Sequence, residues 1–196
     1  MEVDVFVNTV CRSNSFVIKL SDSDICFLID CGDICTLQSY FNKYRFSLKG
    51  VFLTHTHFDH IYGLNGLLQF YPELPVYTSA FGREALMSDK LNLSKYTSTP
   101  FLFRYLQNVK VLEEGNRILL WENKELEVME TPGHDKSCLT YKLNNFLFTG
   151  DSYIPGMNVV ATFPNSNRVE AEISKKRILE LAKACKIYPG HGQCYE

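Results

Sequence analysis

Apolar residues recur along the first half of the chain in short runs that are separated by polar turns. Runs rich in Val, Ile and Phe predict strands over 3–10, 15–20, 25–30 and 50–54. Apolar residues at helical spacing predict a helix over about 35–45. A second helix is expected over about 59–69, with Leu64, Leu67 and Leu68 facing inward. Strands and helices thus alternate, which favours an α/β class.

The second half of the chain continues the alternation. The pattern predicts a strand over 75–78, a helix over 80–88 and strands over 117–121, 125–130, 138–143, 146–149 and 186–188. Asn144-Asn145 predicts a two-residue hairpin turn with positive φ. An amphipathic helix is expected over 168–184, with Val169, Ile173, Leu181 and Ala184 as its apolar face.

One segment, 89–108, has no clear period. It mixes Tyr96, Phe101, Phe103 and Tyr105 with basic residues. Two interpretations stand side by side: a lid or rim over a site, or aromatic packing on the flank of the fold.

Length and composition narrow the class of protein. A chain of 196 residues is expected to form a single domain, 1–196. It is 45% hydrophobic and 21% charged, as is usual for a soluble globular protein. A formal net charge of −2 gives no electrostatic footprint for nucleic acid or acidic membranes. We therefore expect a small-molecule substrate, with no nucleic-acid or membrane partner; nothing in the sequence predicts an oligomeric state.

The N-terminus and the cysteines bear on location. The start, Met1 to Phe6, is acidic and lacks the basic and continuous apolar regions of a secretory signal. No stretch approaches the roughly 20 apolar residues that span a bilayer. The seven cysteines are odd in number and without repeating spacing, which favours free thiols. These features predict a cytoplasmic protein.

The histidines carry the chemistry. Three of the five lie in His55-Thr56-His57-Phe58-Asp59-His60, and His134 and His191 each lie in a turn with Pro and Gly. Imidazole is the commonest neutral nitrogen ligand for zinc and similar ions, and carboxylates complete such sites. The pattern predicts a metalloprotein.

The order of these residues predicts two neighbouring ions. In an extended loop, His55 and His57 point to the same side, whereas a helical turn lets Asp59 and His60 point toward a second ion. Two cations about 3.5–4 Å apart are stabilised by an anionic bridge. Asp151 ends a predicted strand and follows a glycine, so it is the expected bridge.

Together these motifs resemble the metallo-β-lactamase superfamily, in particular its glyoxalase II-like hydrolases, nearly end to end. Asp30, the His55–His60 cluster, His134, Asp151 and His191 match the five motifs of the family in order. The resemblance implies a four-layer αββα sandwich of two mixed sheets flanked by helices. It also implies one metal held by His55, His57, His134 and Asp151, and another by Asp59, His60, Asp151 and His191. Asp30 would contact mainly the metal-binding side chains rather than the metal itself.

The resemblance also implies a metal-dependent hydrolase with two divalent ions, most simply Zn²⁺, with Fe or Mn as alternatives. A metal-bound hydroxide would attack a small ester or thioester, with a hydroxyacyl thioester favoured. Asp59 would orient the nucleophile, and Tyr153 could donate a proton to the oxyanion or leaving group. Glyoxalase II itself has a further C-terminal helical domain for the glutathione moiety, and this sequence resembles a short form without it.

Other functions stay open at this stage. A lactonase of the same fold is one alternative, because Tyr153 lies near the position of a lactonase tyrosine. A mononuclear iron persulfide dioxygenase and a non-catalytic metal-stabilised module are the others. Asp135 and Lys136 replace the small residues that usually follow the motif histidine, and we expect them to place charge beside the cleft.

Overall fold

The first of two sheets comes from the N-terminal half of the chain. In the computed structural model, which describes residues 1–194, its six strands lie in sequence order. The first three pair antiparallel, and the pairs from β3 to β6 are parallel. The strands are β1 (Glu2–Val7), β2 (Asn14–Lys19), β3 (Ile25–Ile29), β4 (Ser47–Phe52), β5 (Val76–Thr78) and β6 (Val109–Val111).

The second sheet comes from the C-terminal half and has the order β11-β10-β9-β8-β7. Its pairs are antiparallel except for β10 and β11, which are parallel because a helix connects them. Asn144 has a φ of 53° in the hairpin turn between β9 and β10, as predicted. The strands are β7 (Arg117–Trp121), β8 (Lys124–Glu130), β9 (Leu139–Leu143), β10 (Phe146–Gly150) and β11 (Lys186–Pro189).

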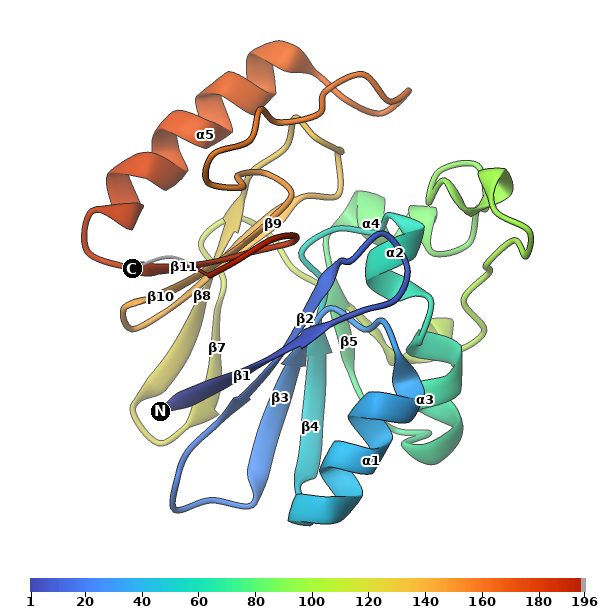
Figure 1. The fold of residues 1–196 in the computed structure, drawn as a ribbon, viewed down its shortest axis with the longest axis vertical. Helices are drawn as coiled ribbons and strands as arrows, with labels where there is room; N and C mark the ends of the chain where they lie inside the picture. Colours follow the sequence, from blue (N-terminus) through green and yellow to red (C-terminus); the bar gives the residue numbers. More distant parts are fainter. Residues whose placement is uncertain (195–196) are drawn as a thin grey trace.

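Helices flank the two sheets on their outer sides (Figure 1). Those of the first half pack on the first sheet, and α5 (Arg168–Ala182) packs on the second. The predicted four-layer αββα sandwich is therefore confirmed. The remaining helices are α1 (Ile34–Tyr44), α2 (Phe58–Ile61), α3 (Leu64–Phe70), α4 (Ala80–Ala85) and the 3₁₀ turns η1 (Ser94–Tyr96) and η2 (Leu106–Asn108). No helix within residues 1–194 is both long and apolar enough to span a bilayer.

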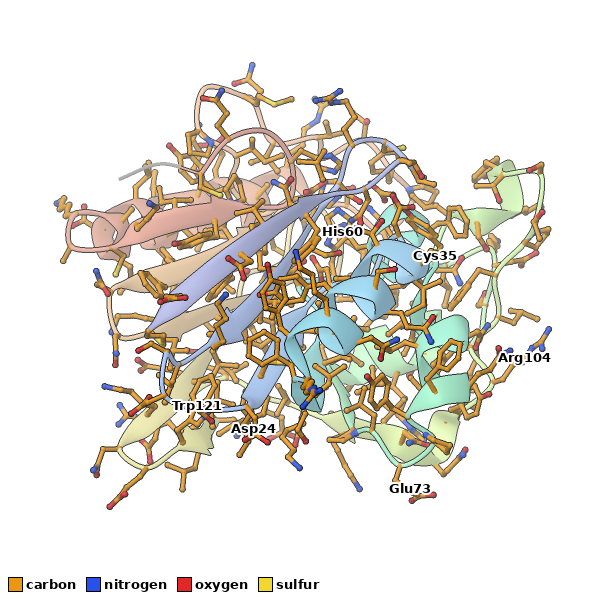
Figure 2. All side chains as sticks on the ribbon, turned by 60° about the horizontal axis from the view of Figure 1, so that its bottom comes forward. Asp24, Cys35, His60, Glu73, Arg104 and Trp121 are labelled. Atoms are coloured by element: carbon orange, nitrogen blue, oxygen red, sulfur yellow. The ribbon has the colours of Figure 1, made fainter. Side chains whose placement is uncertain are left out.

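Large aromatic side chains fill the space between the sheets. The rings of Phe16 and Phe148 lie 5.6 Å apart, and so do those of Phe52 and Tyr141. All four side chains are buried, and aromatic pairs at such distances add to the free energy gained by burial. Figure 2 shows the side chains that fill the molecule, with Arg104 and Glu73 pointing outward at the margin. The two sheets therefore form a rigid base for the loops at their ends.

Two predicted elements differ from the structure, and one segment has no predicted element. The strand expected over 3–10 ends at Val7, because Cys11 and Arg12 turn the chain with positive φ. The helix expected over 59–69 is two helices, α2 and α3. They separate at Gly63, whose N–H bonds to the carbonyl of Cys31 instead of continuing α2. The unplaced segment 89–108 contains two 3₁₀ turns, with Phe101 and Phe103 buried against the first sheet's helices.

The apolar face predicted for the last helix is right only at Leu181, which packs against the core, whereas Val169, Ile173 and Ala184 are exposed. Val169 and Ile173 are 70% and 62% exposed. The buried positions of α5 are instead Ala171, Ser174 and Ile178. Ala171 and Ser174 are small because the helix packs closely on the Pro132-Gly133 turn. The hydrophobic pattern of a sequence cannot predict such a close contact.

Candidate metal centre

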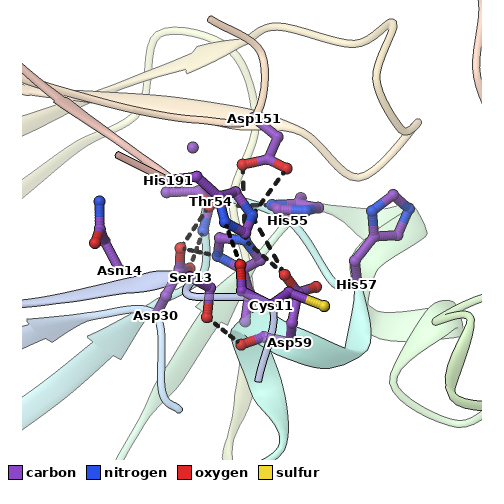
Figure 3. Close-up of polar contacts among 12 residues, drawn as sticks. Cys11, Ser13, Asn14, Asp30, Thr54, His55, His57, Asp59, Asp151 and His191 are labelled. Atoms are coloured by element: carbon purple, nitrogen blue, oxygen red, sulfur yellow. Dashed lines mark hydrogen bonds and ion pairs between the residues drawn. The ribbon is translucent and has the colours of Figure 1, made fainter. Parts of the chain in front are cut away.

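All the predicted ligands meet at one end of the sandwich, where strands from both sheets finish. His55 and His57 follow β4, and Asp59 and His60 lie in α2, the helix that comes next. The other three follow strands of the second sheet: His134 lies just beyond β8, Asp151 beyond β10 and His191 beyond β11. In Figure 3, Asp151 and Asp59 lie on opposite sides of the histidine rings. The seven side chains thus converge although they span 137 positions of the sequence (191 − 55 + 1).

The first donor set is His55, His57 and His134, whose ligand atoms all lie within 4.8 Å of one another. Nε2 of His134 is 2.9 Å from Nδ1 of His57. Asp151 closes the set, with Oδ2 at 3.5 Å from Nε2 of His134. Three imidazoles and a carboxylate suit zinc and similar divalent ions.

The second donor set is Asp59, His60 and His191. Nε2 of His60 is 3.3 Å from Nε2 of His191, and Nε2 of His191 is 3.3 Å from Oδ2 of Asp59. Asp151 also reaches this set, with Oδ2 at 3.4 Å from Nε2 of His191 and Oδ1 at 3.7 Å from Nε2 of His60. Asp151 therefore lies between the two sets, where a bridging carboxylate is expected.

Two unsatisfied polar atoms test whether a metal fits. Nε2 of His55 and Oδ1 of Asp151 are buried and have no hydrogen-bond partner among the described residues. A buried polar atom without a partner costs about 1–3 kcal/mol. A cation between the donor sets would satisfy both atoms at once. The residues present therefore fit a divalent cation at this centre.

Hydrogen bonds fix which ring nitrogen of four histidines faces the centre. Nδ1 of His60 donates to Asp30 at 2.8 Å, and Nδ1 of His134 donates to the Val160 carbonyl at 2.8 Å. Nδ1 of His191 donates to the Cys11 carbonyl at 3.2 Å. Thr54 gives its hydroxyl proton to Asp30, so it accepts from Nδ1 of His55 at 3.2 Å. In all four residues Nε2 is left free to bind metal.

Asp30 has the indirect role that the sequence predicted. Its side chain is buried, and it accepts hydrogen bonds from N and Oγ1 of Thr54, each at 2.7 Å. It does not belong to either donor set. The aspartate therefore holds His60 and the start of the His55 loop in place.

His57 has the opposite orientation, and its partner was not foreseen. Its Nδ1 faces the centre, and its Nε2 lies 3.5 Å from Oδ2 of Asp135. Asp135 is fully buried and accepts from the backbone N–H of Ser137 at 2.8 Å. We expected Asp135 and Lys136 to bring charge to the cleft, and this was wrong. Asp135 lies beneath a ligand, and the Lys136 ammonium lies 5.8 Å from the Phe81 ring, outside the cleft.

The histidines of the two donor sets differ in pKa. Burial alone would lower the pKa of His60, but Asp59, Asp30 and Asp151 outweigh it and raise the pKa to about 9. Hydrogen bonds to Asp151 and Asp59 likewise overcome burial and raise the pKa of His191 to about 10. Burial and the neighbouring imidazoles hold the pKa of His55 well below its usual value. The second set therefore favours positive charge most strongly.

Burial would raise the pKa of Asp151, but the surrounding histidines hold it well below the usual range. The pKa of Asp59 is lowered in the same way, chiefly by His60 against the effect of burial. Both carboxylates are therefore ionised at neutral pH and available as ligands.

Two glycines make room for the ligands. A Cβ at Gly190 would lie 2.1 Å from Oδ1 of Asp151, so only glycine lets Asp151 reach the centre. Gly133 has a φ of 136°, and a Cβ there would lie 2.2 Å from the backbone N of Ala171. Ser174 donates to the Pro132 carbonyl at 2.7 Å. Close packing of α5 on this turn thus positions His134, the next residue.

Tyr153 is not brought to the centre. It packs against Met129, Leu147 and Ile178 beneath α5, and it is not among the residues that line the cleft. Its carbonyl accepts from Oγ1 of Thr149 at 2.7 Å. The proton-donor role predicted for Tyr153 therefore has no support in this arrangement.

An open cleft of about 420 Å³ leads to the donor sets. Its floor includes His57, Asp59, His134, Asp151 and His191. The volume lies in the range of small-molecule sites. A substrate can therefore reach both sets from solvent.

Comparisons with known proteins agree with this geometry. The family model for the metallo-β-lactamase superfamily matches residues 8–191. The chain belongs to this superfamily.

Individual relatives are more distant. A hydroxyacylglutathione hydrolase from Buchnera aphidicola (subsp. Schizaphis graminum) is 27% identical over 148 residues, which are 76% of this chain and 50% of that protein. The chain therefore matches about half the length of this relative.

Solved structures share the fold. The crystal structure of BLEG-1 B3 metallo-β-lactamase has a TM-score of 0.88 and 21% identity, and the match covers 98% of this chain and 93% of that one. The structure of TTHA1623 in a di-iron-bound form has a TM-score of 0.83 and 24% identity, with coverage of 97% and 93%. At such identities the likeness concerns the fold alone.

Proposed function

We propose that this protein is a metal-dependent hydrolase of acyl thioesters or related esters, with two divalent ions in the paired donor sets. The observation that carries the proposal is the placement of Asp151 between the sets. Its Oδ2 lies 3.5 Å from His134 in one set and 3.4 Å from His191 in the other. A carboxylate shared by two donor sets in an open cleft supports two-metal hydrolysis, in which neighbouring ions act on one substrate.

Divalent ions held in these sets would lower the pKa of bound water toward about 7 and polarise a carbonyl oxygen. Zn²⁺ suits the imidazole-rich donors, and Fe or Mn would also be accepted. The protein's own part is to fix these donors. Asp30, the Val160 carbonyl and the Cys11 carbonyl each hold one imidazole in the tautomer that leaves Nε2 free.

Asp59 is the proposed catalytic carboxylate. It is ionised, lines the cleft, and lies within ion-pair distance of His60 and His191. From there it can accept a hydrogen bond from the attacking water and take up its proton. The named activity of the curated relative supports a thioester as the acyl donor.

Two alternatives from the sequence remain as competing predictions. A lactonase of this fold would hydrolyse a cyclic ester at the same centre, but without Tyr153. A mononuclear iron dioxygenase would fill one donor set only, whereas here each set contains three mutually close ligands. Metal content therefore distinguishes the dioxygenase, and a substrate panel distinguishes the lactonase.

The test combines metal removal with that panel. Chelated protein should be inactive, and zinc add-back should restore hydrolysis of a thioester more than of a lactone, a phosphodiester or a β-lactam. Metal analysis of the active form should give two ions per chain. No thioester hydrolysis with Zn, Fe or Mn would contradict the proposal, and so would full activity with one ion per chain.

A further inference from the structure

The wall of the cleft above the metal centre is apolar. Ile154, Met157, Val160 and Phe163 come from the loop between β10 and α5. Val10, Phe58 and Leu93 come from three other segments and face the same space. Separate parts of the chain thus contribute apolar side chains to one surface.

Three of these side chains are not part of the packed interior. Met157, Val160 and Phe163 are 55%, 47% and 37% exposed. The Phe163 ring nevertheless meets the His57 and His134 rings edge-on, with centroids 5.2 and 5.7 Å away. The Val160 carbonyl also holds His134 by its hydrogen bond. The apolar wall is therefore fixed directly beside the first donor set.

Charge is confined to the floor of the cleft. Within residues 1–194, the lining includes no lysine and no arginine, and its only carboxylates are the proposed ligands Asp59 and Asp151. A glutathione thioester carries two carboxylates and an ammonium group. Charged groups that leave water without a partner cost free energy. This wall therefore offers such a substrate no compensation.

Resting on the proposed function, we infer that the preferred substrate is an ester or thioester with an uncharged, apolar acyl chain. The chain would lie along Met157, Val160 and Phe163, with the carbonyl at the donor sets. Hydrolysis consumes one water. A C–O bond forms, the C–S bond breaks, and the thiol leaves with a proton while the acyl group becomes a carboxylic acid.

The first test is a series of N-acetylcysteamine thioesters with acetyl, butanoyl, hexanoyl and octanoyl groups. Each methylene buried against the wall is worth about 0.8 kcal/mol, so kcat/KM should rise up to about fourfold per methylene until the wall is covered. A flat series, or a higher kcat/KM for lactoylglutathione than for the octanoyl thioester, would overturn the inference. Failure to hydrolyse any member would instead contradict the proposed function.

A matched pair of variants locates the effect. Met157→Lys places a cation on the wall, whereas Met87→Lys changes an exposed methionine outside the cleft (55% and 45% exposed). Met157→Lys should lower kcat/KM for the octanoyl thioester about tenfold or more, and lower it much less for the acetyl thioester. Met87→Lys should change neither. An equal loss on both substrates in Met157→Lys would overturn the assignment of this wall.

Binding can be followed without turnover. Cys11 lines the cleft and is exposed, and Cys35 is exposed outside it. 2-Decanone has a carbonyl and an apolar chain but no leaving group. In the metal-loaded protein it should slow alkylation of Cys11 by iodoacetamide, as read by peptide mass spectrometry, more than 2-butanone does. Cys35 should be unaffected. Equal Cys11 alkylation with both ketones would contradict the inference even if the enzyme hydrolyses thioesters.

Discussion

Asp135 lies beneath His57, with its Oδ2 3.5 Å from the ring Nε2. Both atoms are buried, and neither has a hydrogen-bond partner among residues 1–194, so each is satisfied only by this ion-pair contact. The same carboxylate accepts from Ser137, whose hydroxyl in turn accepts from the Thr56 N–H at 3.0 Å. Asp135 thus joins the loop of His134 to the loop of His55 and His57. A carboxylate behind a ligating imidazole fixes its tautomer and increases its basicity.

Asp135→Asn should weaken metal binding at the first donor set. The amide keeps an oxygen for Ser137 but turns an N–H₂ toward Nε2 of His57, which favours the tautomer that cannot bind metal through Nδ1. We expect a loss of about 10–100-fold in zinc affinity, measured by competition with a chromophoric chelator. Glu114→Gln alters an exposed carboxylate paired with Arg177 and serves as the control. Unchanged affinity in Asp135→Asn would show that Asp135 does not position His57.

Gly190→Ala should displace Asp151. The new Cβ would lie 2.1 Å from Oδ1 of Asp151 and 3.0 Å from Cε1 of His60. Metal affinity should fall roughly tenfold or more. The variant should lose its second metal ion while it still folds. Gly66→Ala, whose Cβ would lie 3.3 Å from Ile34, is the control within a helix. Normal metal stoichiometry in Gly190→Ala would rule out the need for close approach.

Asp59→Ala should abolish most of the turnover while the first donor set still binds metal. The variant keeps His55, His57 and His134, so at least one ion should remain by metal analysis. Turnover of the best substrate should fall by about 10²–10⁴, the range for loss of a general base. Undiminished turnover would contradict the dinuclear mechanism.

The stability of the chelated protein should fall as pH rises from 6.5 to 8.5. The pKa values of His60 and His191 are about 9 and about 10 in the fold, above the unfolded value near 6.5. Their stabilising effect is therefore complete below about pH 6.5 and is lost as pH rises through 9 and 10. The free energy of unfolding in urea should decrease by at most about 1.4 kcal/mol per pH unit for each histidine. His191→Gln should flatten this slope, and a rise in stability across the window would contradict the assignment.

The sequence located the candidate ligands because they are polar residues placed just beyond apolar runs. Side chains that follow neighbouring strands of a sheet share an edge, so Asp151 and His191 are readable from the ends of β10 and β11, and His55 from the end of β4 in the other sheet. Asp135 was misread because its burial depends on how two distant loops meet. Periodicity carries no information about that contact.

The last helix shows the same limit in another form. Val169 and Ile173 have the hydrophobicity of core residues, yet they are exposed, and the small residues Ala171 and Ser174 are buried together with Ile178. Ala171 and Ser174 are buried because α5 lies close to Gly133, and that distance is set only when the whole fold is assembled. The apolar wall of the cleft was missed because its residues come from a loop without regular spacing.

The span of chain between facing ligands has a consequence for folding. The His57–His134 contact joins residues 77 apart, and the His60–His191 contact joins residues 131 apart. Ions bound between them would act as reversible cross-links between the two halves of the chain. Closing loops of that length costs the unfolded chain much conformational entropy. Bound metal should therefore stabilise the folded protein, and the half-life in heat or with a protease should increase with metal concentration.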